Sequence, residues 1–355
     1  MKRKKVNNMV DKPKISVILP AYNAEKYVAK TLESLLTQTL KEVEFICVND
    51  GSKDGTLKLL KEFEKNDGRI KIIDKKNEGV WKARIDGISA ATGQYIAFMD
   101  ADDYVEKNFL EELYKSITKN NADMAVCGFR RIDEKKGKIL SQEMKYEETK
   151  IIEKEKNFEE VISINTALWN KLYKTEILKN LNDLSNPPRI LEDMMFLSMV
   201  YQKTNKISFV DNYLYNYMVI EGSAMNTLKK EEIEKIQNAM LEIKKQYIEE
   251  NANTESMEIL ASMAFLHFGI SLMLKASGTN NCDFSEEYKK NLKFLNENFP
   301  EWKKTKYTKI MYCLKNKSAN LKLAVVRKVY ICHLFKVFIL TYKFITKTLK
   351  IDIKW

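Results

Sequence analysis

The feature that most constrains the fold of this chain is the alternation of short apolar runs with amphipathic stretches between residues 15 and 130. Each run is almost wholly apolar, as is typical of a parallel strand buried on both faces. The stretches between them place apolar residues on one side of a helix. The pattern predicts an open three-layer α/β sheet, Rossmann-like in layout, with strands at residues 15–19, 43–48, 70–73, 95–99 and 124–129.

The alternation fades beyond residue 130. Residues 131–160 are polar and charged, and we expect them to form a solvated excursion. Apolar periodicity returns at residues 161–217, and residues 228–275 are typical of two helices. A linker is expected at residues 278–281. We therefore predict a nucleotide-binding domain over residues 1–225 and a helical C-terminal region over residues 226–355.

Polar clusters follow four of the predicted strands. Ligands of open α/β sheets bind outside the carboxyl ends of the strands, which is where these clusters should meet. Any one cluster could be an ordinary turn, because Asn, Asp and Gly are common turn residues. Four at one sheet edge predict a nucleotide pocket formed by residues 20–23, 49–52, 77–79 and 100–103.

The sharpest of these clusters holds Asp100, Asp102 and Asp103 around Ala101. Crowded carboxylates repel one another, so the protein alone gains little from this arrangement. A divalent cation removes that cost, and oxygen ligands suit Mg²⁺ or Mn²⁺. The simpler alternative is that Asp102 or Asp103 caps the helix expected to begin near Glu106.

These motifs resemble those of family 2 glycosyltransferases with the GT-A fold. The matching stretches are SVILPAYN from residue 16, VNDGSKDGT from residue 48, NEG from residue 77 and FMDADD from residue 98. The resemblance covers residues 14–220. It implies inverting transfer of a sugar from a nucleoside-diphosphate sugar, usually UDP-linked, with Mn²⁺ or Mg²⁺ as cofactor. The acceptor would be a cell-surface glycan or a lipid-linked molecule.

The resemblance also assigns the donor site. Tyr22 would lie against the uracil ring and Asp50 would hydrogen-bond the base, while Arg84 or Lys82 would neutralise a phosphate. Asp102 would be the principal metal ligand, and Asp103 would support it. The implied nucleotide-sugar-binding set is Pro20, Tyr22, Asn23, Asp50, Asn77, Gly79, Lys82, Arg84, Asp100, Ala101 and Asp102.

A base and an acceptor site are assigned in the same way. A one-step inverting reaction needs a carboxylate that takes the proton of the acceptor hydroxyl. The motif LEDMMF from residue 191 matches the family's Glu-Asp motif, which implies Asp193 as base with Glu192 orienting it. Both could instead be acids favoured by a helix N-terminus. Trp169, Asn170 and Lys171 would line the acceptor side.

Positive charge is concentrated in the C-terminal part of the chain. Residues 301–355 carry 14 Lys and Arg against 2 Asp and Glu, whereas the other 300 residues carry 46 against 47. From residue 325 to 350, Lys336, Lys343, Lys347 and Lys350 share one helical face beside a broad apolar face. This pattern predicts an amphipathic helix on an anionic membrane and argues against a nucleic-acid partner. A helix packed on the domain and a dimer contact are alternatives.

Two other functions fit parts of the sequence. A metal-dependent nucleotidyltransferase would also use carboxylates on an α/β sheet, but it would normally carry a Gly-rich basic loop near its first strand. A non-catalytic membrane-surface scaffold would explain only the basic tail. With scattered cysteines, no secretory-type start and no long apolar run, we expect a cytoplasmic protein peripheral to the inner face of the membrane.

Overall fold

The computed structural model describes residues 12–220, 230–277 and 283–349. The chain divides into two compact units, each described separately below. Unit 1 comprises Met1–Lys156, Asn165–Asp183 and Glu192–Ser223, and unit 2 comprises Asn157–Ile164, Leu184–Leu191 and Ala224–Trp355. The predicted domain boundary after residue 225 lies outside the described residues. The two short segments that unit 2 takes from the first part of the chain were not predicted.

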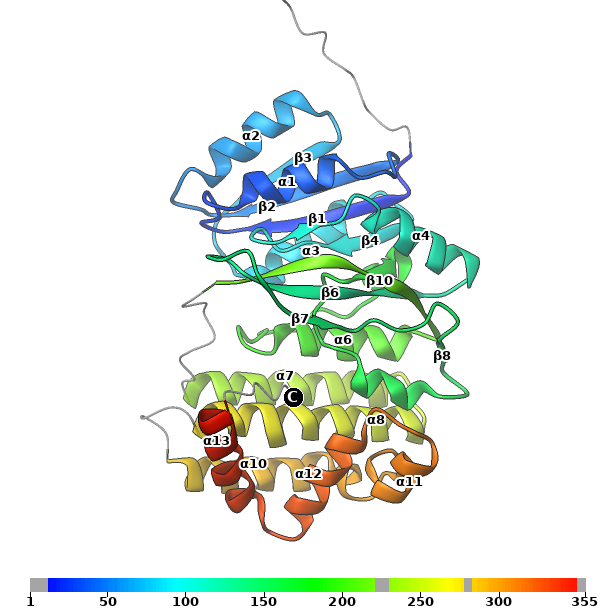
Figure 1. Cartoon of the computed structure of the whole chain (residues 1–355), viewed down its shortest axis with the longest axis vertical. Helices are drawn as coiled ribbons and strands as arrows, with labels where there is room; N and C mark the ends of the chain where they lie inside the picture. Colours follow the sequence, from blue (N-terminus) through cyan, green and yellow to red (C-terminus); the bar gives the residue numbers. More distant parts are fainter. Residues whose placement is uncertain (1–11, 221–229, 278–282, 350–355) are drawn as a thin grey trace, which may run out of the picture. The chain divides into compact units, whose positions relative to one another are not determined.

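Unit 1 is built on one large sheet in the order β3-β2-β1-β4-β9-β6-β10-β5 (Figure 1). All five predicted strands are present, and four of the apolar runs are almost wholly buried, whereas in β3 only Ile70 is buried. The strands of this path are β1 (Ile15–Ala21), β2 (Val43–Asp50), β3 (Ile70–Lys75), β4 (Tyr95–Phe98), β5 (Tyr104–Val105), β6 (Met124–Asp133), β9 (Lys171–Lys174) and β10 (Lys206–Val219).

The sheet is parallel only in part. Strands β3, β2, β1 and β4 are parallel to one another, with Ile15 opposite both Val43 and Tyr95. Strand β9 then runs antiparallel to both β4 and β6. The expectation that residues 131–160 are a solvated excursion was wrong in part. Strand β7 (Ile139–Glu143) pairs with β6, and β8 (Ile151–Glu153) pairs with β10. Strand β7 has no buried residue, so no alternation of buried apolar and exposed polar residues marked it in the sequence.

Helices cover both faces of the sheet, which confirms the three-layer prediction. Helices α1 (Val28–Leu36), α2 (Thr56–Asn66) and α4 (Phe109–Lys119) share one core with the odd-numbered residues of β1. On the opposite face, α3 (Val80–Ala90) and α6 (Glu192–Lys203) meet through Trp81 and Phe196, whose rings lie 5.6 Å apart. Phe196 also packs against Phe98 of β4. A short helix, α5 (Thr175–Lys179), follows β9.

Unit 2 is helical. Helix α8 continues through a π-helical segment at Phe265–Leu272 into α9, so the helix Thr254–Ser277 has 24 residues, against 20 in α7. The stretch Thr254–Ser277 is long and apolar enough to cross a membrane, but 72% of its most apolar window is buried, as in a core helix. The α-helices are α7 (Lys230–Glu249), α8 (Thr254–Ala264), α9 (Met273–Ser277), α10 (Phe284–Asn298), α11 (Ile310–Lys315), α12 (Leu321–Ile331) and α13 (Phe335–Leu349).

The predicted continuous helix over residues 325–350 was wrong. Helix α12 ends at Ile331, and α13 begins at Phe335 after a turn in which His333 has a φ of 58°. Part of the predicted apolar face is buried, since Ile339 is buried and the neighbouring Phe335 stacks on Tyr288 of α10. Lys350 of the predicted basic stripe and the predicted linker at residues 278–281 lie outside the described residues.

Candidate active site

Residues 100–103, here called the acidic loop, follow β4 and are anchored by α1. The Thr31 hydroxyl donates to the Ala101 carbonyl at 2.9 Å and to the Asp103 carbonyl at 2.7 Å. Thr31 itself is fully buried. Because Thr31 holds both carbonyls, the backbone of this loop has little freedom. Its carboxylates therefore stay at the carboxyl end of β4.

Asp103 supports this loop from the other side. Its Oδ2 accepts from the Tyr215 hydroxyl and its Oδ1 from the Met218 backbone amide, both at 2.7 Å. The side chain is only 1% exposed, and burial raises its pKa well above the usual range. With both oxygens engaged and buried, Asp103 is poorly placed to bind a metal ion, so its predicted role as a metal ligand is corrected to that of a positioning residue.

Tyr215 is therefore expected to matter for stability. In Tyr215→Phe, the Asp103 carboxyl loses its buried hydroxyl donor, and a buried polar group left without its partner costs about 1–3 kcal/mol. We expect a loss of that size in the free energy of unfolding, measured by urea denaturation. Tyr213→Phe on the same strand is the matched control, since Tyr213 is only half-buried. Equal losses in the two variants would contradict the role assigned to Asp103.

Arg84 of α3 joins the acidic loop to α6. Its Nη1 lies 2.6 Å from Oδ1 of Asp193 and 4.0 Å from Oε1 of Glu192, while its Nη2 lies 3.6 Å from Oδ1 of Asp100. The guanidinium is 4% exposed, and the surrounding carboxylates raise its pKa despite burial. Arg84 thus brings the predicted base beside the acidic loop. Its burial and these three acidic neighbours do not fit the predicted contact with a phosphate.

Asp100 and Glu192, which lie beside Arg84, have strongly raised pKa values. Burial raises the pKa of Asp100 to about 7, with Arg84 acting in the opposite direction. Burial and the neighbouring Asp193 raise the pKa of Glu192 to about 7 as well. Asp100, Glu192 and Asp193 all remain partly exposed, so their carboxylates are accessible from outside the protein. Perturbed carboxylates gathered in this way are typical of a functional site.

Asp102 is the group in this loop best suited to a metal ion. Among the residues that the structure describes, it forms no ion pair, and burial raises its pKa. Within residues 12–220, 230–277 and 283–349, no three His, Cys, Asp or Glu side chains are grouped to hold a metal by themselves. Mg²⁺ is commonly held by one or two carboxylates together with substrate phosphates. The acidic loop fits that kind of binding.

Tyr22, which was predicted to stack on the base, and its neighbour Asn23 have different surroundings in the structure. Tyr22, just after β1, is 49% exposed, and Pro20 beside it is half-buried, so the Tyr22 ring is free to stack on a flat ligand. Asn23 instead supports a neighbouring loop. Its Oδ1 accepts from the backbone amide of Lys53 at 2.8 Å, and its backbone amide donates to the Ser52 hydroxyl at 3.0 Å.

Asp50 at the end of β2 holds the loop that follows β3. Its two carboxylate oxygens accept from the amides of Glu78 at 2.9 Å and Gly79 at 2.8 Å. Gly79 has a φ of 93°, which favours glycine, and Asn77 donates to the Asp50 carbonyl at 2.8 Å. Because Asp50 is only 3% exposed, its predicted hydrogen bond to the base does not fit this geometry.

Lys82 of α3 is partly exposed, between the buried residues Trp81 and Ala83. Its ammonium pairs with Asp183, which also accepts a hydrogen bond from the Trp81 indole at 2.7 Å. A phosphate contact through Lys82 would therefore require this pair to open. The structure does not bring Lys82 into the carboxylate cluster around Arg84.

The three residues predicted for the acceptor side occupy different positions. Asn170 and Lys171 are completely buried, and four oxygen atoms of Asn165, Ala167 and Asn170 lie within hydrogen-bond distance of the Lys171 Nζ. Asn170 donates to the Cys127 carbonyl at 2.7 Å. These two side chains brace the junction of β6 and β9, so direct contact with an acceptor does not fit their burial.

Trp169 belongs to an aromatic stack that the sequence did not reveal. Its ring lies 4.2 Å from that of Tyr215 and 5.6 Å from that of Tyr217, both nearly parallel to it. Tyr217 remains half-exposed, and its pKa is raised by burial and by the acidic loop. Residues two apart in a strand point the same way, so the spacing of Tyr215 and Tyr217 was a usable signal.

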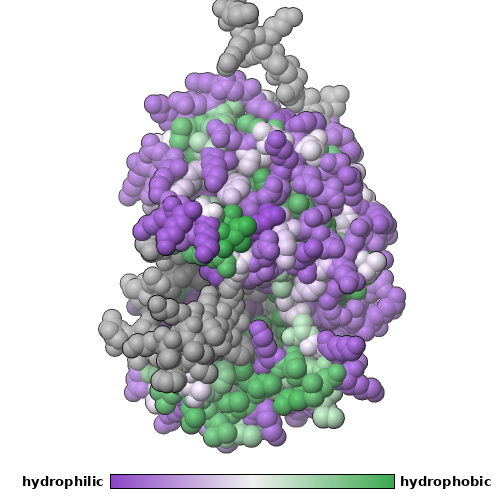
Figure 2. Space-filling model, in the orientation of Figure 1, coloured by the Kyte–Doolittle hydropathy of each residue, from purple (hydrophilic) through white to green (hydrophobic). Residues whose placement is uncertain are grey.

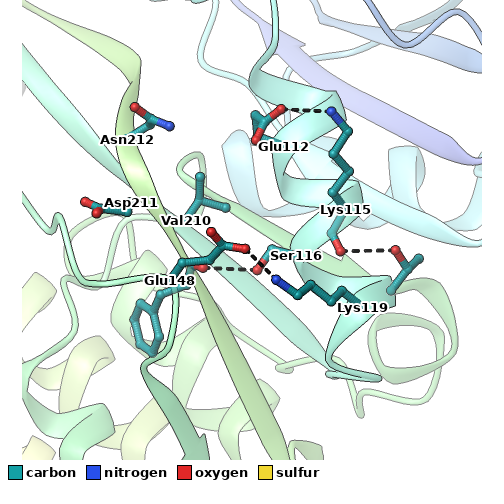
Figure 3. A pocket seen from close by; sticks show the side chains of 10 residues that line it. Glu112, Lys115, Ser116, Lys119, Glu148, Val210, Asp211 and Asn212 are labelled. Carbon is teal, nitrogen blue, oxygen red and sulfur yellow. Dashed lines mark hydrogen bonds and ion pairs between the residues drawn. The ribbon is translucent and has the colours of Figure 1, made fainter.

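Among the described residues of unit 1, one hollow lies at two of the predicted nucleotide-binding clusters and another lies away from them. An open one of about 630 Å³ at the ends of β2 and β3 includes Asn77 and Gly51 in its lining. Another of about 470 Å³ lies between α4 and β10, where Lys119 pairs with Glu148 at 2.8 Å (Figure 3). None of the predicted site residues lines this second hollow.

Comparison with known proteins gives a consistent family. Residues 16–181 match the model described as Glycosyl transferase family 2. Glycosyltransferase GlyG of Streptococcus pneumoniae is 31% identical over 229 residues, which cover 60% of this chain and 73% of GlyG. Glycosyltransferase GlyA of the same species is 33% identical over 261 residues, 71% of this chain but only 35% of GlyA.

The fold is shared with a solved structure. Staphylococcus aureus TarS 1-349, in a crystal structure with UDP-GlcNAc, superposes with a TM-score of 0.67 at 24% identity, covering 90% of this chain and 92% of that one. This likeness supports a GT-A fold with a helical C-terminal region.

The relative GlyA is much longer than the matched part, so this chain corresponds to only about a third of it.

Proposed function

This chain belongs to glycosyltransferase family 2, and we propose that it transfers a sugar with inversion from a UDP-sugar to a hydroxyl group of a cell-surface glycan or lipid-linked acceptor. One observation carries the proposal. Arg84 holds Asp193 at 2.6 Å and Asp100 at 3.6 Å, so a candidate base lies beside the acidic loop where the diphosphate would bind.

Asp193 serves as the base in this proposal. Its carboxylate takes the proton from the acceptor hydroxyl as that oxygen forms a bond to the anomeric carbon of the sugar. The bond from the anomeric carbon to the diphosphate oxygen breaks at the same time, and UDP leaves with the electron pair. Attack opposite to the leaving group inverts the anomeric configuration. The bond to Arg84 fixes the Asp193 carboxylate for this step.

The acidic loop serves the departing diphosphate. A Mn²⁺ or Mg²⁺ ion bound there would offset the negative charge that develops on the leaving group. Asp102 would hold it, Asp100 would face the ribose or sugar, and Asp103 with Tyr215 would keep the loop in place. Tyr22 would stack on the uracil ring from the exposed end of β1.

Acceptor recognition is assigned to aromatic groups in place of Asn170 and Lys171. The half-exposed ring of Tyr217, stacked on Trp169, offers a flat face of the kind on which sugars pack. Its pKa is raised in part by Asp103, Asp100 and Asp102, so the ring lies within the electrostatic reach of the acidic loop. Neither alternative considered from the sequence, a nucleotidyltransferase or a non-catalytic scaffold, agrees with membership of a glycosyltransferase family.

The donor is testable by ligand-linked stabilisation. We expect one UDP-sugar, in the presence of Mn²⁺, to raise the melting temperature, because a ligand at about 100 times its Kd adds about 2.7 kcal/mol of stability. The measurement is a thermal-shift panel of UDP-, GDP- and dTDP-sugars with Mn²⁺ or with EDTA. Stabilisation by a GDP- or dTDP-sugar alone would contradict the proposed donor.

A further inference from the structure

We propose that unit 2 docks on an anionic lipid bilayer through a surface formed by α11, α12 and α13, here called the docking surface. Large exposed apolar side chains are concentrated there. Of the eleven among the described residues, seven lie between residues 311 and 340. They are Met311 (78% exposed), Leu314 (56%), Val325 (46%), Ile331 (40%), Leu334 (53%), Val337 (59%) and Leu340 (70%).

The same part of the chain has an unusual charge composition. Residues 302–351 contain 13 Lys and Arg and no Asp or Glu. In the space-filling view, apolar side chains gather on unit 2 in the region of α12 (Figure 2). A segment that exposes apolar side chains and carries basic residues but no acidic residue of its own favours a partner that offers both an apolar interior and negative charge.

Basic and apolar residues share the outer face of α12. Lys322, Val325 and Lys328 are exposed at a spacing of three residues, so they lie along one side of the helix. The opposite side is buried: Arg327 donates to the carbonyl groups of Trp302 and Thr308. These hydrogen bonds fix the orientation of α12, so that Lys322, Val325 and Lys328 face the solvent.

Helix α13 continues the same arrangement. Phe335 and Ile339 are buried, whereas Lys336, Val337 and Leu340 are exposed. Phe335 lies 4.0 Å from the ring of Tyr330 of α12, so the two helices are packed together. Helix α11 also packs against α12, so the docking surface is carried by three packed helices and is a preformed part of the fold. It differs from the single amphipathic helix that the sequence suggested.

Two other occupants fit the charges less well. A second copy related by a two-fold axis would place the lysines of one docking surface against those of the other, and like charges repel. A nucleic acid would satisfy the lysines but leave side chains such as Leu340 in water. A bilayer of anionic lipid accepts both, since apolar groups enter the acyl boundary while lysines meet the headgroups.

The test is co-sedimentation of the full chain with vesicles of phosphatidylcholine, or of equal parts phosphatidylcholine and phosphatidylglycerol. We expect binding to the anionic vesicles, weakened by salt. The double variant Lys322→Gln/Lys328→Gln should weaken that binding roughly thirtyfold, because each lysine near an anionic surface contributes about a fivefold effect. Leu340→Glu should weaken it roughly tenfold or more, because its apolar side chain no longer enters the boundary.

Ile248→Glu is the matched control, since Ile248 of α7 is 59% exposed and lies outside the docking surface. It should bind vesicles as the wild type does. Absence of wild-type binding, or equal losses in Ile248→Glu and Leu340→Glu, would overturn the proposal. So would dimerisation lost in Leu340→Glu without any vesicle binding. UDP release without vesicles is measured alongside, so failure of docking is distinguished from failure of the proposed reaction.

Discussion

Replacement of Asp193 by asparagine is expected to lower kcat by roughly two to four orders of magnitude, the usual contribution of a general base. Asparagine keeps an oxygen that can accept from Arg84, so the 2.6 Å contact and the fold should be preserved. The variant cannot take the acceptor proton near neutral pH. Affinity for the nucleotide sugar, measured by calorimetry, should change little, because the donor is recognised at the acidic loop and at Tyr22.

Glu192→Gln is the comparison that makes this experiment specific. The pKa of Glu192 is raised to about 7, so its side chain carries a proton for part of the time at neutral pH. Glutamine has the same shape as that neutral form, and Glu192 lies 4.0 Å from Arg84. We expect a much smaller loss of kcat than in Asp193→Asn. A larger loss in Glu192→Gln would identify Glu192, and not Asp193, as the base.

The sheet and the position of the site could be predicted because they depend on local patterns. An apolar run that is too short for a helix and bounded by turn residues has few alternatives to a buried strand. Strands β1 and β2 therefore begin at the predicted residues, Ile15 and Val43. The polar clusters that follow them meet at one sheet edge because the strands are parallel.

The division of labour within the clusters could not be predicted. Asp50, Asp102 and Asp103 are the same residue type in similar turns, and only burial separates them. Asp50 and Asp103 bind backbone amides, whereas Asp102 forms no ion pair among the described residues. The partners of Asp103 on β10 lie more than a hundred residues away in the chain. No local pattern reports such a contact.

Arg84 illustrates the same limit. In the sequence, Arg84 is a basic residue one turn into a predicted helix and follows the motif NEG at residues 77–79. That position favours a contact with a phosphate. In the structure it is buried because α6 places Asp193 against it from a segment far along the chain. The break between α12 and α13 was also hidden, since residues 332–334 contain neither Gly nor Pro and His333 adopts the left-handed conformation.

Asp102→Ala is expected to have the second large effect. Stabilisation of a leaving group by a metal ion is worth several kcal/mol, so transfer should fall by roughly a thousandfold or more. The fold should be retained, because the loop is anchored through Thr31, Asp103 and Tyr215 and not through Asp102. Stabilisation by the UDP-sugar should lose its dependence on Mn²⁺ in this variant.

Asp211→Ala is the matched control. Asp211 is 48% exposed in unit 1, pairs with Lys145 at 3.0 Å and lines the hollow of Figure 3, which none of the predicted site residues lines. Its removal changes the net charge by the same amount as Asp102→Ala. Transfer and metal dependence should both stay at the wild-type level.

The central claim, metal-dependent sugar transfer at the acidic loop, is tested most directly by the rate of UDP release from the stabilising UDP-sugar. The rate is measured for the wild type, Asp102→Ala and Asp211→Ala, with Mn²⁺ and with EDTA. We predict Mn²⁺-dependent release in the wild type and in Asp211→Ala, and loss of that release in Asp102→Ala. Release by Asp102→Ala near the wild-type rate, or equal rates with Mn²⁺ and EDTA, would contradict the account.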